Sequence, residues 1–291
     1  MGKKAFDPER ENRFLSVCRS LLRENKLAAF SAVLIAVFVL MAVCAPLLTP
    51  YTFDGMDILN RLAKPSGEHL LGTDEAGRDV FTRLLYGARI SLLVGVVPTV
   101  ISMLIGAVLG IVAGFAGGKT DAVIMRLADI MLAFPSMLLA MVIMYTFGDG
   151  LINIFLALAL VNWASVARIV RSETLRLKET AYVEAARSIG VGRWKIMLTH
   201  ILPNCIPSLI VLFTLNVPSA ILSESALSFL GLGVQLPNSS WGLMVSTGRQ
   251  FLYERPWLSL APSAAIMLTV LAFNFLGDGL RDTLDPHLKN R

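Results

Sequence analysis

Long apolar segments alternate with shorter polar, mostly basic segments along this chain. An α-helix needs about 20 apolar residues to cross a hydrocarbon layer about 30 Å thick. Six segments reach or approach that length with few charges: residues 27–48, 90–115, 127–147, 151–170, 205–222 and 257–276. We therefore expect an all-α, polytopic membrane protein with six transmembrane helices.

The composition supports the membrane assignment. Of the 291 residues, 55% are hydrophobic and only 16% are charged, whereas soluble domains are usually about 45–50% apolar. The first span could be taken for a signal peptide, but its apolar stretch is about twice the usual 7–15 residues. We interpret residues 27–48 as a retained anchor.

The basic residues predict the orientation of the chain, because cytoplasmic loops carry the excess of Lys and Arg. With the N-terminus inside, nineteen of the 26 Lys and Arg fall on inner segments and seven on outer segments. Both termini are thus expected in the cytoplasm. The predicted organisation is a cytoplasmic tail at 1–26, the anchor at 27–48, an extracytoplasmic loop at 49–89 and a membrane core at 90–291.

Several other functions are disfavoured by the sequence. The net charge of +5 could indicate nucleic-acid binding, but the basic residues gather on one membrane side without interleaved aromatic residues. Cys18, Cys44 and Cys205 have no paired spacing, so neither a disulfide framework nor a zinc site is expected. Residues 113–120 approximate a phosphate-binding loop, but they follow an apolar span rather than a buried strand. If ATP drives this protein, another chain binds it.

Two features inside the spans suggest packing. Gly106, Gly110 and Gly114 form two small-xxx-small pairs, which permit close helix contact within the chain or with a second chain. Arg126 and Asp129 stand three residues apart near the inner end of the third span. We expect them to form a local ion pair.

The longest inner loop, residues 172–204, contains an unusual polar unit. Two alanines that follow Glu184 would allow a short helix to approach a neighbour closely, Gly190 permits a turn, and Pro203 restricts the start of the next span. We expect two short helices at an angle, with Glu184, Arg187 and Ser188 on one polar face. An ordinary amphipathic loop on anionic headgroups is the alternative.

The spacing of this unit resembles a known pattern: Glu-Ala-Ala, three residues, Gly, nine residues, Ile, one residue, Leu-Pro. It is the loop of the permease subunits of binding-protein-dependent ABC importers. His200 stands where the pattern has Ile, and the matching residues are Glu184, Ala185, Ala186, Gly190, Leu202 and Pro203. The resemblance implies a coupling helix that inserts into a groove on an ATPase subunit. The implied coupling residues are Glu184, Ala185, Ala186, Arg187 and Gly190.

Further motifs along the chain are similar to the dipeptide/oligopeptide/nickel type of these importers, and within it to the "C" permease subunit. They are His69 to Asp74, Gly77 to Asp79, Phe229 to Gly233, Trp241-Gly242, Phe273-Asn274, Gly277-Asp278 and Leu284 to Pro286. The resemblance implies the type I ABC importer permease fold.

The function implied by this resemblance is import of dipeptides or oligopeptides across the cytoplasmic membrane by alternating access. The expected partners are a second homologous permease subunit, giving a heterodimer, two ABC ATPase subunits that bind ATP and Mg, an extracytoplasmic substrate-binding protein, the peptide and membrane lipid. No catalytic, cofactor-binding or metal-binding residue is expected in this chain. Asn216 and Ser219 are candidates for the translocation pathway. A nickel or nickel-chelate importer and, from another class, a secondary transporter are the alternatives.

Overall fold

A computed structural model describes residues 25–284, and this part of the chain is mostly helical with no named β-strand. Residues 1–24 and 285–291 lie outside the described part, and so do most of the expected N-terminal tail, Cys18 and the end of the C-terminal motif. The helices are α2 (Lys26–Leu48), η1 (Ile58–Asn60), α3 (Val80–Ala116), α4 (Gly118–Ala133), α5 (Ser136–Phe147), α6 (Leu151–Leu177), α7 (Ala181–Ser188), α8 (Arg193–Ile196), η2 (Met197–Ile201), α9 (Leu202–Phe229), α10 (Trp241–Gly248), η3 (Arg249–Phe251) and α11 (Trp257–Leu284).

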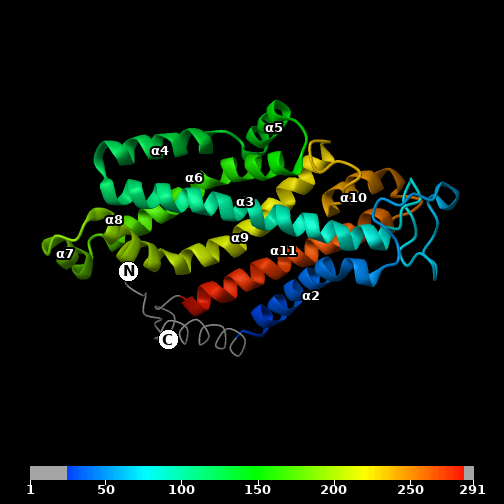
Figure 1. Cartoon of the computed structure of the whole chain (residues 1–291), viewed down its shortest axis with the longest axis horizontal. Helices are drawn as coiled ribbons and strands as arrows, with labels where there is room; N and C mark the ends of the chain where they lie inside the picture. The colour runs from blue at the N-terminus through cyan, green and yellow to red at the C-terminus, as the bar shows by residue number, and fades with distance from the viewer. Residues whose placement is uncertain (1–24, 285–291) are drawn as a thin grey trace, which may run out of the picture.

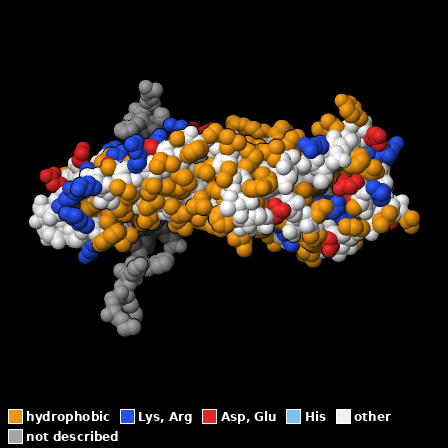
Figure 2. Space-filling view, turned by 90° about the horizontal axis from the view of Figure 1, so that it is seen from above, with side chains coloured by type: hydrophobic (Ala, Val, Ile, Leu, Met, Phe, Trp, Pro, Cys, Tyr) orange, Lys and Arg blue, Asp and Glu red, His pale blue; other side chains and the backbone are white. Residues whose placement is uncertain are grey.

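The helices form one elongated bundle (Figure 1). Five stretches of helix in the described part are long and apolar enough to cross a membrane, and α4 with α5 makes a sixth if this bent pair is one span. Figure 2 shows hydrophobic side chains over the middle of the bundle and charged side chains gathered toward its ends. The prediction of an all-α, polytopic membrane protein is confirmed.

The third expected span, residues 127–147, is not one straight helix. The helices α4 and α5 meet at an angle of 92°. Between them Phe134 has extended backbone angles (φ −91°, ψ 143°) and Pro135 precedes α5. The ring of a proline disfavours the helical conformation of the residue before it, so the helix ends at Ala133.

Two spans begin earlier than the apolar pattern predicts. α3 begins at Val80 rather than at residue 90, because Asp79 caps it by accepting the backbone N–H of Thr82 at 2.7 Å. Residues 80–89, expected in the outer loop, are therefore helical. The fifth span runs without a break from Arg193 to Phe229. Its helix passes Pro203 through the π-helical turn η2, in which the Leu202 N–H donates to the Met197 carbonyl five residues earlier.

The helices α3 and α6 pack closely along the expected glycine face. A Cβ on Gly106 would stand 2.8 Å from the Trp163 carbonyl oxygen, and one on Gly110 would stand 2.6 Å from that of Ala167. A Cβ on Gly114 would stand 2.9 Å from the Arg171 carbonyl oxygen, one turn further along α6. The glycine face is therefore used within this chain, and larger side chains would separate α3 from α6.

The prediction of an ion pair between Arg126 and Asp129 is wrong. Asp129 instead pairs with Arg168 of α6 at 2.8 Å, and Asp121 of α4 accepts a 2.6 Å bond from Arg171 Nη2. Both acidic residues thus tie α4 to its neighbour α6 rather than stabilising α4 locally. Asp121 and Asp129 can reach arginines of α6 because α4 and α6 lie side by side (Figure 1).

Candidate functional site

The helix α7 lies at one end of the bundle with α8 (Figure 1). Its last turn closes in a pattern that requires glycine: Gly190 has φ +80°, and the N–H of Val191 donates to the Ala186 carbonyl at 3.1 Å. A residue with a Cβ resists this left-handed conformation. Gly190 therefore ends α7 and sets the angle at which the chain enters α8.

One face of α7 is anchored in the chain's own core. Val183 is completely buried and Ala186 is 6% exposed. Both belong to an apolar cluster with Phe115 of α3, Ile196 of α8 and residues of α6, η2 and α9. The second alanine of the Glu-Ala-Ala unit thus contacts this chain, not a neighbour. Glu184 and Ala185 are exposed.

Glu184, Arg187 and Ser188 are all exposed on α7, but no ion pair or side chain–side chain hydrogen bond joins them in the described structure. The guanidinium of Arg187 lies 4.8 Å from the centre of the Phe115 ring, and Glu184 makes no ion pair among residues 25–284. Ser188 donates to the backbone carbonyl of Glu184 at 3.1 Å, not to its carboxylate. Arg187 therefore helps to hold α7 on α3, which leaves the Glu184 carboxylate free to meet a partner.

Exposed apolar side chains surround Glu184 and Ala185 in the sequence, a feature that the sequence analysis missed. Ile189 is 81% exposed and Trp194 is 69% exposed, while Tyr182 and Leu198 are also exposed. Ile189 and Trp194 flank the Gly190 turn, so their position beside this break was the available signal. We name Tyr182, Glu184, Ala185, Ile189 and Trp194 the α7–α8 surface.

The two candidate pathway residues lie on α9, away from α7. Asn216 is half-buried and Ser219 is exposed. Ser219 also accepts, through its backbone carbonyl, a 2.8 Å bond from the Ser223 hydroxyl. Leu215 and Leu222 are exposed on the same helix. The described chain thus leaves Ser219 and part of Asn216 uncovered among exposed leucines, and it does not join them to the α7–α8 surface.

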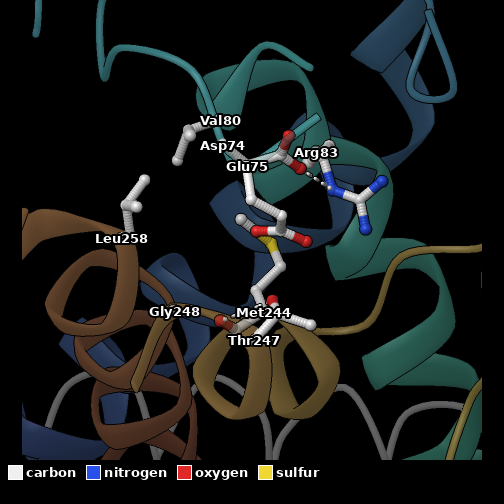
Figure 3. A pocket seen from close by; sticks show the side chains of 8 residues that line it. All are labelled: Asp74, Glu75, Val80, Arg83, Met244, Thr247, Gly248 and Leu258. Atoms are coloured by element: carbon white, nitrogen blue, oxygen red, sulfur yellow. Dashed lines mark hydrogen bonds and ion pairs between the residues drawn. The ribbon is translucent and has the colours of Figure 1, made fainter. Parts of the chain in front are cut away.

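The opposite end of the bundle is held by buried charges. Asp74 accepts a 2.7 Å bond from Arg78 Nε and lies 3.5 Å from Arg83 Nε, and all three side chains are buried. Figure 3 shows Asp74, Glu75 and Arg83 facing α10 residues across a small pocket. The space in it that the centre of a water molecule can reach is only about 10 Å³, far below the volume of a ligand pocket. This pocket is a junction between the loop from α2 to α3, α3 itself, α10 and α11.

A second buried network joins α9 to α10. The Glu224 carboxylate accepts bonds from the hydroxyls of Ser228 at 2.6 Å and Ser240 at 2.8 Å. Ser240 also caps α10 by accepting the Leu243 N–H at 3.1 Å. Glu224 was expected in an outer loop, but α9 continues to Phe229 and buries it completely.

The described residues offer no arrangement suited to a metal ion. No group of three or more His, Cys, Asp or Glu between residues 25 and 284 could hold one. His69 makes a 2.9 Å contact with Asp79 instead. Residues 113–120 form the end of α3, a turn at Gly117 and the start of α4, with no strand before them.

Comparison with known proteins places these features in a family. Residues 106–290 match the family described as "Binding-protein-dependent transport system inner membrane component", and residues 18–65 match "N-terminal TM domain of oligopeptide transport permease C". These two matches cover most of the chain, including α7, α9 and α11.

Named relatives agree with the family matches. The chain is 46% identical over 269 residues to the dipeptide transport system permease protein DppC of Alkalihalophilus pseudofirmus, covering 92% of this chain and 88% of the relative. It is 43% identical to the oligopeptide transport system permease protein OppC of Bacillus subtilis, with the same coverage. It is 41% identical to the probable D,D-dipeptide transport system permease protein DdpC of Escherichia coli, covering 97% and 95%. This chain therefore belongs to the family of multi-pass inner membrane components of binding-protein-dependent transport systems.

Proposed function

We propose that this chain is a permease subunit of an ATP-driven importer that moves dipeptides or oligopeptides across the cytoplasmic membrane. The observation that carries the proposal is the exposure of the α7–α8 surface on a helix fixed from behind by Val183 and Ala186. A helix that is anchored on one face and exposed on the other is suited to transmit a push or pull from a partner.

The partner at this surface is an ABC ATPase subunit, which binds ATP and Mg. Glu184 and Ala185 contact the ATPase directly, because both are exposed. Ala186, Arg187 and Gly190 support them from the chain's own side through the apolar cluster, the Phe115 ring and the left-handed turn. Closure of two ATPase subunits then moves α7, and the unbroken helix from Arg193 to Phe229 carries that movement across the membrane.

The substrate assignment rests on the names of the relatives, which are dipeptide and oligopeptide permeases. These names give the nickel alternative no support. The exposed stripe of α9 with Asn216 and Ser219 is the pathway side of this chain, and a second, homologous permease subunit covers it to form a heterodimer. A substrate-binding protein delivers the peptide at the opposite end, where the buried networks hold α10 and the outer loop.

ATP hydrolysis by the reconstituted complex tests this function. The chain is co-expressed with candidate ATPases, a second permease and a binding protein, and hydrolysis is measured with and without di- to pentapeptides. Peptide should stimulate hydrolysis by the wild type, and Glu184→Arg should abolish that stimulation. Asp282→Arg, which reverses another exposed carboxylate at the end of α11, is the matched control and should keep it.

Other outcomes contradict parts of the proposal. Stimulation only by a nickel-loaded binding protein would overturn the peptide assignment. Transport by the purified chain alone would indicate a secondary transporter. Failure of the chain to copurify with any ATPase would overturn the importer assignment.

A further inference from the structure

An apolar groove runs between α2 and α3 on the outer half of the bundle. Apolar side chains of both helices line it, among them Val39, Val43 and Leu93, and Arg89 is the single charged residue among the described residues of the lining. Its volume is about 510 Å³. Val39, Val43 and Leu93 are exposed, so no described part of this chain covers the groove.

Arg89 lies at a depth where the surroundings are apolar. It contacts the carbonyls of Ala42 and Val43, which stand five or six residues before the end of α2 at Leu48. At 1.5 Å per residue these carbonyls lie about 8 Å inside the end of a helix whose length of about 34 Å is close to the hydrocarbon thickness. The centre of the Tyr86 ring lies 4.9 Å from the guanidinium carbon, and a cation over an aromatic ring is attracted to it.

The bonds of Arg89 to α2 follow from a proline. Pro46 has no N–H, so the Ala42 carbonyl four residues earlier lacks its helical donor. Arg89 Nε supplies that donor, and Nη2 donates to the Val43 carbonyl at 3.0 Å. These bonds use two of the five guanidinium N–H groups.

Within residues 25–284 the positive charge of Arg89 has no counter-ion. None of the ion pairs among residues 25–284 includes Arg89. An arginine at membrane depth is costly unless it is paired or reaches the interface, and it is a functional candidate by default. An anion that reaches this groove from the bilayer would remove the cost and use the remaining donors.

We propose that the groove binds one anionic phospholipid of the outer leaflet, with an acyl chain along α2 and α3 and the phosphate on Arg89. Guanidinium and phosphate match in charge and in geometry, since two parallel N–H groups can meet two phosphate oxygens. The groove is apolar along the rest of its length and open toward the bilayer, which suits an acyl chain. This site is separate from the proposed peptide pathway.

Native mass spectrometry of the full chain in detergent tests the site, with phosphatidylglycerol and phosphatidylcholine of the same acyl chains as probes. We expect one retained lipid and a preference of about fivefold for phosphatidylglycerol, as one interfacial basic residue supplies. Arg89→Gln should abolish the preference. Leu93→Trp should fill the groove and lower retention of both lipids, while it leaves the Arg89 bonds to α2 in place.

The matched control is Arg249→Gln, which removes an exposed arginine at the same end of the bundle, beside the Phe229 ring, and should keep the preference. Equal retention of the two lipids by the wild type, or an unchanged preference in Arg89→Gln, would overturn the site. If Arg89→Gln does not give a monodisperse protein, Leu93→Trp alone tests the site. Unchanged lipid retention in that variant would then overturn the proposed site. Loss of a dimer of this chain in Leu93→Trp, with lipid retention intact, would show that a second copy occupies the groove instead.

Discussion

The two ends of this bundle are built differently. At the end with α10, buried ion pairs and hydrogen bonds join different structural elements, such as the loop before α3 to α3 through Asp74 and Arg83, and α9 to the start of α10 through Glu224 and Ser240. At the other end, α7 is held by a small apolar contact and presents Ile189 and Trp194 to the outside. The polar groups at the α10 end are therefore paired within the chain, whereas the α7 end leaves a surface for a partner.

This difference separates stability from coupling. Substitutions at the α10 end should change the free energy of unfolding, because they leave buried polar groups without partners. Substitutions on the α7–α8 surface should leave the free energy of unfolding unchanged and alter only the binding and coupling of the partner. The following four predictions run from the largest expected change in stability to the smallest.

Asp74→Ala should destabilise the chain by about 3 kcal/mol. It leaves the buried Arg83 without an ion-pair partner among the described residues and leaves Arg78 with Glu75 alone. Thermal unfolding in detergent, followed by tryptophan fluorescence, measures the change. Asp129→Ala, which removes the half-exposed pair with Arg168, should cost less than about 1 kcal/mol. Equal losses of stability in the two variants would show that the buried ion pairs of Asp74 stabilise the chain no more than an exposed ion pair does.

Glu224→Ala should cost about 2 kcal/mol, since the buried hydroxyls of Ser228 and Ser240 would lose their acceptor. Glu224→Gln keeps an acceptor oxygen and should cost less than half as much in the same unfolding assay. If alanine and glutamine behave alike, the hydrogen bonds do not hold α10 on α9.

Gly190→Val should loosen α7 without lowering the overall unfolding temperature. A φ of +80° costs a residue with a Cβ about 1–2 kcal/mol, and this strain falls on a segment held by few contacts. Hydrogen exchange of residues 181–191 should become about tenfold faster. Gly192→Val is the matched control, because Gly192 has φ −62° and open space around it; equal acceleration in both would contradict the role of the left-handed turn.

Ile189→Glu should change stability by less than about 0.5 kcal/mol, because the side chain is already in water. It should nevertheless reduce copurification of the ATPase with the permease complex. Ile58→Glu alters an isoleucine of similar exposure (70%) at the opposite end and should leave the ATPase bound. A loss of ATPase in both variants, or in neither, would remove the distinction between the two ends.

Much of the fold follows from the apolar pattern, because a bilayer forces each span to be a long apolar helix. Where the pattern failed, local chemistry was decisive. Pro135 breaks the third span through its effect on Phe134, and the Asp79 cap extends α3 through residues that are polar enough to look like a loop. Neither effect is visible in an average of hydrophobicity.

The functional surface was only partly predictable. The motif identified the segment from Glu184 to Gly190, but its spacing could not tell that Ala186 faces inward or that Arg187 lies on Phe115. These contacts come from α3, about 70 residues away in the sequence, and a local pattern holds no information on them. The same limit applies to Asp129, whose partner Arg168 lies on another helix.

Site-specific crosslinking tests most directly whether α7 is the contact with the ATPase. In a chain whose Cys18, Cys44 and Cys205 are replaced by alanine, Ala185→Cys and Ala186→Cys are compared for crosslinking to an ATPase carrying a single cysteine in its groove. We expect a nucleotide-dependent crosslink from position 185, which is exposed, and none from position 186, which is buried against the chain's own core. Equal crosslinking from both positions, or none from position 185, would contradict the proposed coupling role of α7.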